Sequence, residues 1–170
     1  MGSIVKKVNF SLAAKILFTC ILFNLIGGVL FGFLVSLTVP FQDLPKDSFF
    51  FTSIAGKLEK TTLQILVEAM FANIVVNTAV LVSMRMKDDA GKVAAIIFII
   101  FIFAFLGFEH VIANFPAFSL AYFASNGAIE AFTAGNVIHN LFWAFIGGGL
   151  IMGLGYAWLD KDNKNLTYFD

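Results

Sequence analysis

The stretch "FAFLGFEHVIANFPAF", residues 103–118, decides how the whole chain is interpreted. It lies inside a run, residues 93–128, that contains no Lys or Arg and only one acid. Within this apolar run, four polar or helix-breaking residues stand close together: Glu109, His110, Asn114 and Pro116. A polar group without a partner in hydrocarbon costs roughly 2–7 kcal/mol. Ionisable residues at membrane depth therefore indicate a functional site.

The composition is that of a membrane protein. Hydrophobic residues make up 59% of the chain and charged residues 13%, against about 45–50% and about 25% in soluble domains. Runs of about 20 apolar residues can cross a bilayer, and the chain has four: 16–38, 63–84, 93–127 and 137–159. We predict an all-α membrane protein, a single membrane domain over residues 1–170, with four transmembrane helices. The scarcity of charge and of any phosphate loop argues against an enzyme, and we expect no cofactor and no nucleic-acid partner.

The basic residues predict the orientation. With the N-terminus in the cytoplasm, eight of them are internal: Lys6, Lys7, Lys15, Arg85, Lys87, Lys92, Lys161 and Lys164. Three are external: Lys46, Lys57 and Lys60. This excess agrees with the positive-inside rule. We expect a multi-pass protein of the cell membrane with both termini cytoplasmic.

The third run, residues 93–127, is too long for one ordinary crossing. It could be one helix over 93–112 with Glu109 and His110 at the outer interface, or two half-helices that meet inside the membrane. Asn is a favoured N-cap and Pro suits a first helical turn. Asn114 and Pro116 therefore fit the start of a second half-helix, although the residues alone leave both alternatives open.

Two segments of the sequence resemble each other. "NLIGGVLFGFL" begins at Asn24 and "AFIGGGLIMGL" at Ala144, and they share Ile-Gly-Gly followed two positions later by Leu. Each has a small-xxx-small spacing, which lets helix backbones approach closely in lipid; the glycines are Gly28 and Gly32, and Gly149 and Gly153. Glycine-rich membrane helices also look alike by composition alone, so a chance likeness stays open.

A true repeat would be a unit of three helices. Successive copies of an odd-numbered unit have opposite orientation, which is the inverted-topology plan of many transporters. Residues 16–38 would then be the last helix of an incomplete first repeat, and residues 63–159 a complete second repeat. The first two helices of the first repeat would be absent from this chain.

The run "KDDAGKVAAIIFIIFIFAFLGFEHVIANF", residues 87–115, resembles the formate/nitrite transporter family. In that family a short K-D-x-x-G-K loop and an apolar half-helix precede G-F-E-H-x-x-A-N, which corresponds here to Gly107, Phe108, Glu109, His110, Ala113 and Asn114. "NLIGG", "FANIVVNTAVLVSM" (71–84) and "IGGGLIMGLGYAWL" (146–159) also agree. The resemblance covers nearly the whole chain and corresponds to helices three to six of a six-helix family.

The resemblance implies an aquaporin-like inverted-repeat fold, pentamers with a pore in each protomer, and transport of small monovalent weak-acid anions such as formate or nitrite. Two departures stand out. The family's broken second helix, which lines the pore opposite the fifth, has no counterpart here. The last helix reads Trp143-Ala144 where the family has Gly-Asn, so one polar pore contact is in doubt.

His110 is the central residue of the predicted pathway. A half-helix N-terminus presents free N–H groups and a positive dipole end, and a neighbouring His can donate a proton near neutral pH. A buried His with an ordinary structural partner is the alternative, and the family motif favours function. Glu109 points about 100° away from His110 on a helix, so we expect it to be a structural acceptor for N–H groups freed at the break.

The resemblance also implies that Asn73, Lys57 and Phe103 belong to the substrate pathway. It implies that Asn73 faces the pore, that Lys57 draws anions into the outer vestibule and disfavours a proton on His110, and that Phe103 marks a narrow point. An interhelical hydrogen bond is an alternative for Asn73, and more so for Asn77; a solvated loop residue is an alternative for Lys57. Glu68 has no family counterpart, and we expect a snorkelling or paired acid.

Two other functions compete with a complete transporter. A water or glycerol channel would need two Asn-Pro-Ala boxes, whereas residues 114–117 read "NFPA" and no second box exists. The stronger rival is a truncated or split-gene fragment that acts only with a partner supplying two helices. His139 is interpreted as an interfacial anchor.

Overall fold

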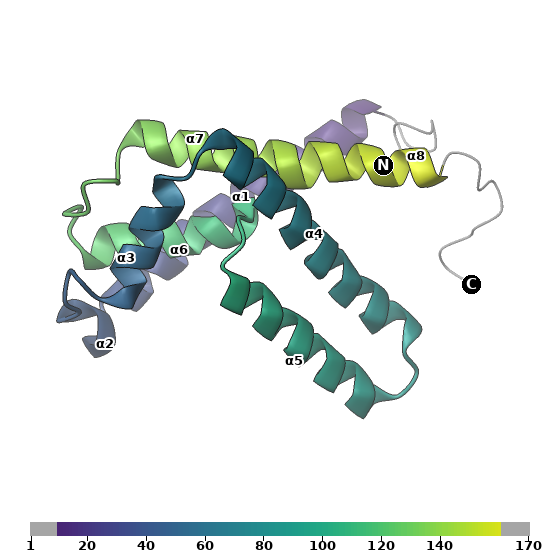
Figure 1. Ribbon diagram of the computed structural model, residues 1–170, viewed down its shortest axis with the longest axis horizontal. Helices are drawn as coiled ribbons and strands as arrows, with labels where there is room; N and C mark the ends of the chain where they lie inside the picture. The colour runs from purple at the N-terminus through teal and green to yellow at the C-terminus, as the bar shows by residue number, and fades with distance from the viewer. Residues whose placement is uncertain (1–9, 161–170) are drawn as a thin grey trace.

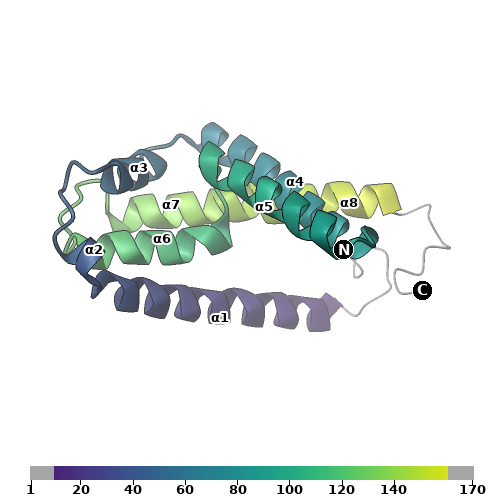
Figure 2. The same ribbon diagram turned by 90° about the horizontal axis from the view of Figure 1, so that it is seen from below.

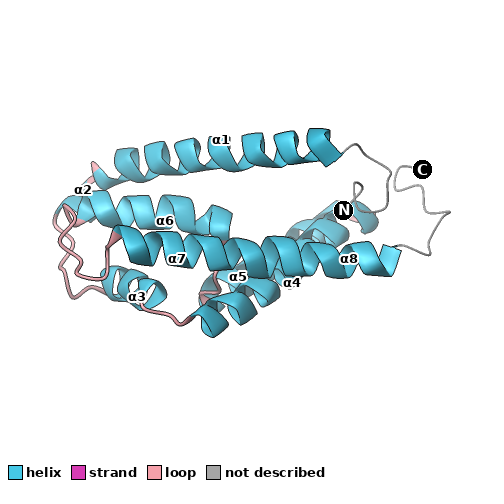
Figure 3. Ribbon diagram, turned by 90° about the horizontal axis from the view of Figure 1, so that it is seen from above, coloured by secondary structure: helices cyan, strands magenta, loops and turns pink. Residues whose placement is uncertain are grey.

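The computed structural model describes residues 10–160, and this part of the chain folds into helices and loops without a strand (Figure 3). The elements are α1 (Phe10–Ser36), α2 (Val39–Gln42), α3 (Phe49–Leu58), α4 (Thr62–Arg85), α5 (Asp89–Leu106), α6 (Val111–Ala124), α7 (Ala134–Ala144), the π-helical η1 (Phe145–Ile151) and α8 (Met152–Asp160). Four helical segments are long and apolar enough to cross a membrane: Ser11–Ser36, Thr62–Arg85, Asp89–Leu106 and Ala134–Gly155. The predicted all-α membrane protein with four spans is confirmed.

The predicted orientation remains a prediction. Four of the eight basic residues assigned to the inner side lie outside the described residues: Lys6, Lys7, Lys161 and Lys164.

The break in the third apolar run is present. Helix α5 ends at Leu106, Gly107 adopts a left-handed conformation with φ of 59°, and α6 begins at Val111. A residue with a Cβ is strained in this conformation, so Gly107 allows the chain to leave the helix. The non-helical residues 107–110 therefore separate two helices within the third apolar run, as the alternative of two half-helices predicts.

The predicted start of the second half-helix is wrong. The N-cap of α6 is His110, whose Nδ1 accepts from the backbone N–H of Ala113 at 3.4 Å. Asn114 lies one turn inside the helix, and Pro116 lies further in still. Any side chain with an acceptor beside the first free N–H groups of a helix can cap it, even if its residue type is rarely an N-cap. His110 stands directly before the first helical residue, Val111, whereas Asn114 lies within the helix.

Side chains of the usual N-cap types cap the N-termini of α4, α5 and α7. Thr61 and Gln64 form a reciprocal capping box at α4, Asp88 accepts from Gly91 N–H at 2.6 Å at α5, and Thr133 caps α7. These contacts satisfy N–H groups that a helix cannot satisfy itself.

Helix α1 lies along α6, and α6 lies between α1 and α7 (Figures 2 and 3). Three small residues at intervals of four, Gly28, Gly32 and Ser36, are the buried residues of α1. A Cβ added at Gly32 would lie 2.5 Å from the backbone N of Leu120, and one at Gly28 would lie 2.8 Å from Phe115 Cβ. The predicted close approach at Gly28 and Gly32 is confirmed.

The second small-residue pair was assigned incorrectly. Gly147 and Gly148 are buried against α4, and a Cβ at Gly147 would lie 2.6 Å from the carbonyl oxygen of Leu66. Gly153 has no neighbour within 4 Å, and Gly149 meets mainly Phe145 of its own helix. The wider π turn of η1 changes which residues face α4, because a π-helix does not keep the 3.6-residue period.

Helices α4 and α5 form an antiparallel pair that extends away from the α6–α7 layer (Figure 1). The short helix α3 packs across α6 and α7, and its apolar residues Phe51, Ile54 and Leu58 are buried with Phe118 and Ala121 of α6. This packing holds the loop after α3 beside the α5–α6 break.

Candidate functional site

A fully buried carboxylate, that of Glu109, lies at the break between α5 and α6. Its side chain is 0% exposed, and both oxygens are occupied. Oε1 accepts from Lys60 Nζ at 2.8 Å and Lys57 Nζ at 3.2 Å. Oε2 accepts from Asn114 Nδ2 at 2.7 Å and Asn140 Nδ2 at 3.1 Å. Paired charges and hydrogen bonds are what make burial of an ionised acid tolerable.

Lys57 joins α3 to the end of α5. Besides Glu109, its ammonium donates to the carbonyl oxygens of Gly107 at 2.8 Å and Phe108 at 3.2 Å. Carbonyl groups at a helix C-terminus lack intrahelical donors and carry partial negative charge, so a lysine there stabilises the break.

Lys60 connects two acids. Its ammonium lies 2.6 Å from Glu68 Oε2 and 2.8 Å from Glu109 Oε1. The expectation that Glu68 is a paired acid is confirmed. Glu109 is likewise an acceptor as expected, but its donors are side chains rather than the N–H groups freed at the break.

The two lysines differ in their electrostatic surroundings. Burial lowers the pKa of Lys57, and the nearby charge of Glu109 offsets that effect only in part. Burial also acts to lower the pKa of Lys60, but hydrogen bonds to Glu109 and Glu68 outweigh it and raise its pKa. Lys60 is therefore the more strongly stabilised cation of the pair.

Asn140 of α7 completes the cluster. It is 0% exposed, accepts from Asn114 Nδ2 at 2.8 Å and donates to the Lys57 carbonyl oxygen at 3.0 Å. One amide thus ties together α3, α6, α7 and the break. We call the group of Lys57, Lys60, Glu68, Glu109, Asn114 and Asn140 the polar cluster.

His110 adjoins the polar cluster but makes different contacts. Its Nδ1 accepts from Ala113 N–H, so in the neutral ring the proton is on Nε2. Nε2 has no hydrogen-bond partner among residues 10–160, and the half-buried ring makes an edge contact with Phe103, with centroids 5.8 Å apart. The structure thus brings His110 and Phe103 together and leaves one ring nitrogen available to donate.

Asn73 lies apart from this group. Its Nδ2 donates to the carbonyl oxygen of Ala69 one turn earlier in α4, at 3.1 Å, and the side chain lies against Gly148 of η1. Asn77 makes no hydrogen bond within the described part of the chain, so the interhelical bond suggested for either amide is absent there. His139 accepts from or donates to Thr62 Oγ1 at 3.0 Å, which links α7 to the start of α4.

The reading of the sequence missed Lys60 and Asn140. Lys60 was counted only among the external basic residues, and no function was predicted for Asn140. Asn140 is a polar residue inside the apolar run 137–159, and this position could have indicated a buried polar contact. Ala144, one turn later, is buried beside Ile65 and Ala69, so an apolar cluster occupies the position where the family has Asn.

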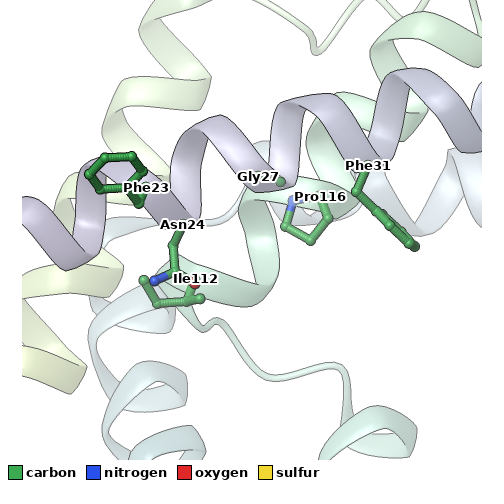
Figure 4. A pocket seen from close by; sticks show the side chains of 7 residues that line it. Phe23, Asn24, Gly27, Phe31, Ile112 and Pro116 are labelled. Atoms are coloured by element: carbon green, nitrogen blue, oxygen red, sulfur yellow. The ribbon is translucent and has the colours of Figure 1, made fainter.

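An open groove of about 520 Å³ runs between α1 and the start of α6 (Figure 4). Its lining is mainly apolar, with Asn24 projecting from α1 on the side of Ile112 and Pro116. Asn24 Nδ2 donates to the Cys20 carbonyl oxygen of its own helix. Among the described residues, no three His, Cys, Asp or Glu side chains form a metal site.

Comparison with known proteins gives a consistent result. The sequence model of the family described as "Formate/nitrite transporter" matches residues 1–158. The chain is 35% identical over 155 residues to the uncharacterized transporter YrhG of Bacillus subtilis, with 84% of this chain and 55% of that protein covered. It is 34% identical over 154 residues to the nitrite transporter NirC of Escherichia coli, covering 86% and 55%.

A formate-nitrite transporter of Plasmodium falciparum is 30% identical over 167 residues, covering 93% of this chain and 54% of that protein. The chain thus spans about half the length of the curated relatives it matches. The extent of the family match, over four apolar spans and the broken helix, shows that this multi-pass membrane protein belongs to the formate/nitrite transporter family.

Proposed function

We propose that this chain takes part in the transport of small monovalent weak-acid anions, such as formate or nitrite, along a pathway past His110. The observation that carries the proposal is the position of His110 as the N-cap of α6, with Nε2 free of partners among the described residues. The printed names of the relatives, which include a nitrite transporter, support the substrate class.

The chemistry of this position suits an anion. The first N–H groups of a helix attract negative charge without adding a full positive charge to the pathway. A donor on Nε2 could hydrogen-bond the anion or give it a proton, which would lower the cost of crossing an apolar constriction. Phe103, in contact with the His110 ring, would form that constriction.

The remaining members of the predicted site act around this centre. Lys57 would attract anions and, as a nearby cation, disfavour a proton on His110. Glu109 and Asn114 would hold the break in place, and Asn73 would contribute a polar contact from α4. We propose further that the protein is a pentamer of the cell membrane with both termini cytoplasmic.

The test is flux of labelled formate and nitrite into proteoliposomes. The variant His110→Phe should abolish flux while the protein still folds and assembles, as judged by its elution profile in detergent. His139→Phe is the matched control, because the His139 ring bonds Thr62 Oγ1 and makes no hydrogen bond to residues 107–110. Equal flux from both variants and the wild type would exclude a role for His110.

A second candidate is a partner-dependent transporter half. The inverted-repeat plan assigns residues 16–38 to the end of one repeat and residues 63–159 to a complete second repeat. The observation that favours this candidate is the open groove beside α6, which no described element covers. Helices from another polypeptide would close the pathway on that side.

This candidate is tested by reconstituting the 170-residue chain alone and beside a fusion to the first two helices of a family member. Partner dependence predicts saturable formate flux from the fusion and background flux from the chain alone. Robust flux from the pure chain would contradict it.

A further inference from the structure

We propose that Lys60 is the outer capture site for the transported anion, and that in the empty protein the carboxylate of Glu68 occupies this site in the anion's place. The inference rests on the proposed function and adds a binding step to it. Its substrate class is a monovalent anion with carboxylate-like or nitrite-like oxygens.

The geometry gives Lys60 one permanent and one exchangeable partner. Glu109 is 0% exposed and held by four donors, so it anchors Lys60 from the buried side. The Glu68 side chain is 25% exposed, and its Oε2 lies 2.6 Å from the same ammonium. Only its Oε2 is bound within the described chain. Solvent and dissolved anions can therefore reach the Lys60–Glu68 contact but not the Lys60–Glu109 contact.

The charges of the polar cluster specify a monovalent guest. Lys57 and Lys60 contribute two positive charges, and Glu109 contributes one negative charge. The remaining charge of +1 needs one counter-anion, which Glu68 supplies in the structure. An entering anion of charge −1 restores the same balance when Glu68 turns away, whereas a neutral solute does not.

The exchange is energetically feasible because the contact is partly solvated. The side chains of Lys60 and Glu68 are 21% and 25% exposed, and the Glu68 side chain on α4 can rotate to water without changing the fold. Lys60 keeps its position during the exchange, since Glu109 still holds it. The guest would then lie beside the break, near the N-terminus of α6.

The experiment measures binding separately from transport. The 170-residue chain in lipid nanodiscs is titrated with [13C]formate, and the dissociation constant is taken from the broadening of the formate NMR signal. Glu68→Gln removes the internal competitor and should lower the dissociation constant about two- to fivefold. Lys60→Gln should raise it by at least as much, and Lys60→Arg, which keeps the charge, should stay near wild type.

Glu59→Gln is the matched control, because Glu59 is an exposed neighbour of Lys60 that makes the same change in net charge and forms no ion pair among residues 10–160. An unchanged or weakened affinity in Glu68→Gln, or an equal gain in Glu59→Gln, overturns the inference. If the wild type gives no flux in proteoliposomes while these binding shifts remain, the proposed transport function is refuted and the proposed binding of the anion at Lys60 is supported.

Discussion

Asn140 Nδ2 donates to Glu109 Oε2 at 3.1 Å, although the two residues lie 31 positions apart in the sequence. Both are fully buried, so this bond joins the middle of α7 to the break between α5 and α6. The same amide holds the backbone of Lys57. The break is therefore held by specific hydrogen bonds as well as by apolar packing.

Asn140→Leu should destabilise the protein. The change removes one of the two amide donors to Glu109 Oε2 and the amide donor to the Lys57 carbonyl oxygen. Loss of a buried hydrogen-bond partner costs about 1–3 kcal/mol. The measurement is the midpoint of thermal unfolding in detergent. Asn77→Leu is the control, because Asn77 makes no hydrogen bond among the described residues; an equal shift in both variants would contradict the proposed importance of Asn140.

Glu109→Gln should lower the unfolding free energy more than the same change at an exposed acid does. The change removes the negative charge that pairs with both Lys57 and Lys60. The two ammonium groups then repel each other in a partly buried environment. Hydrogen bonds to charged groups contribute about 1.5–3 kcal/mol, so we expect a loss of about 2 kcal/mol in unfolding free energy. Glu130→Gln, at an exposed position, should leave the unfolding midpoint unchanged, and similar behaviour of the two variants would argue against the polar cluster.

Gly107→Ala tests the geometry of the break. At φ of 59° a Cβ costs about 1–2 kcal/mol, although no neighbouring atom lies within 4 Å of the position it would take. We expect a modest fall in the unfolding midpoint that comes from backbone strain alone. Gly56→Ala is the control, since Gly56 also has free space but lies inside α3. A fall for Gly56→Ala and none for Gly107→Ala would show that the left-handed turn is not retained in the membrane.

Gly32→Val tests the contact between α1 and α6. A side chain there would meet the backbone of Leu120, and overpacking of this kind costs about 1–3 kcal/mol. The expected result is a lower unfolding midpoint and a reduced yield of monodisperse protein on size-exclusion chromatography. Gly27→Val, at a position of α1 where an added Cβ has no neighbouring atom within 4 Å, should behave as wild type. The α1–α6 arrangement is wrong if Gly27→Val is the more harmful of the two.

The sequence by itself determined which four segments are apolar and long enough to cross a membrane. For the third run the residues alone left two alternatives, and the family resemblance favoured the broken helix. Apolar length and capping residues act within a few positions of each other, so they can be read directly along the chain. The glycines Gly28 and Gly32 were recognised for the same reason, because their spacing places them on one face of one helix.

Only the tertiary structure decided what surrounds Glu109. Its partners Lys60 and Asn140 lie 49 and 31 positions away and come from different elements, and no local pattern encodes such contacts. The π turn of η1 also shifted the packing glycines from the predicted Gly149 and Gly153 to Gly147 and Gly148. The physical reason is the same in each case: local periodicity fixes a helix, whereas its neighbours depend on how separate helices pack together.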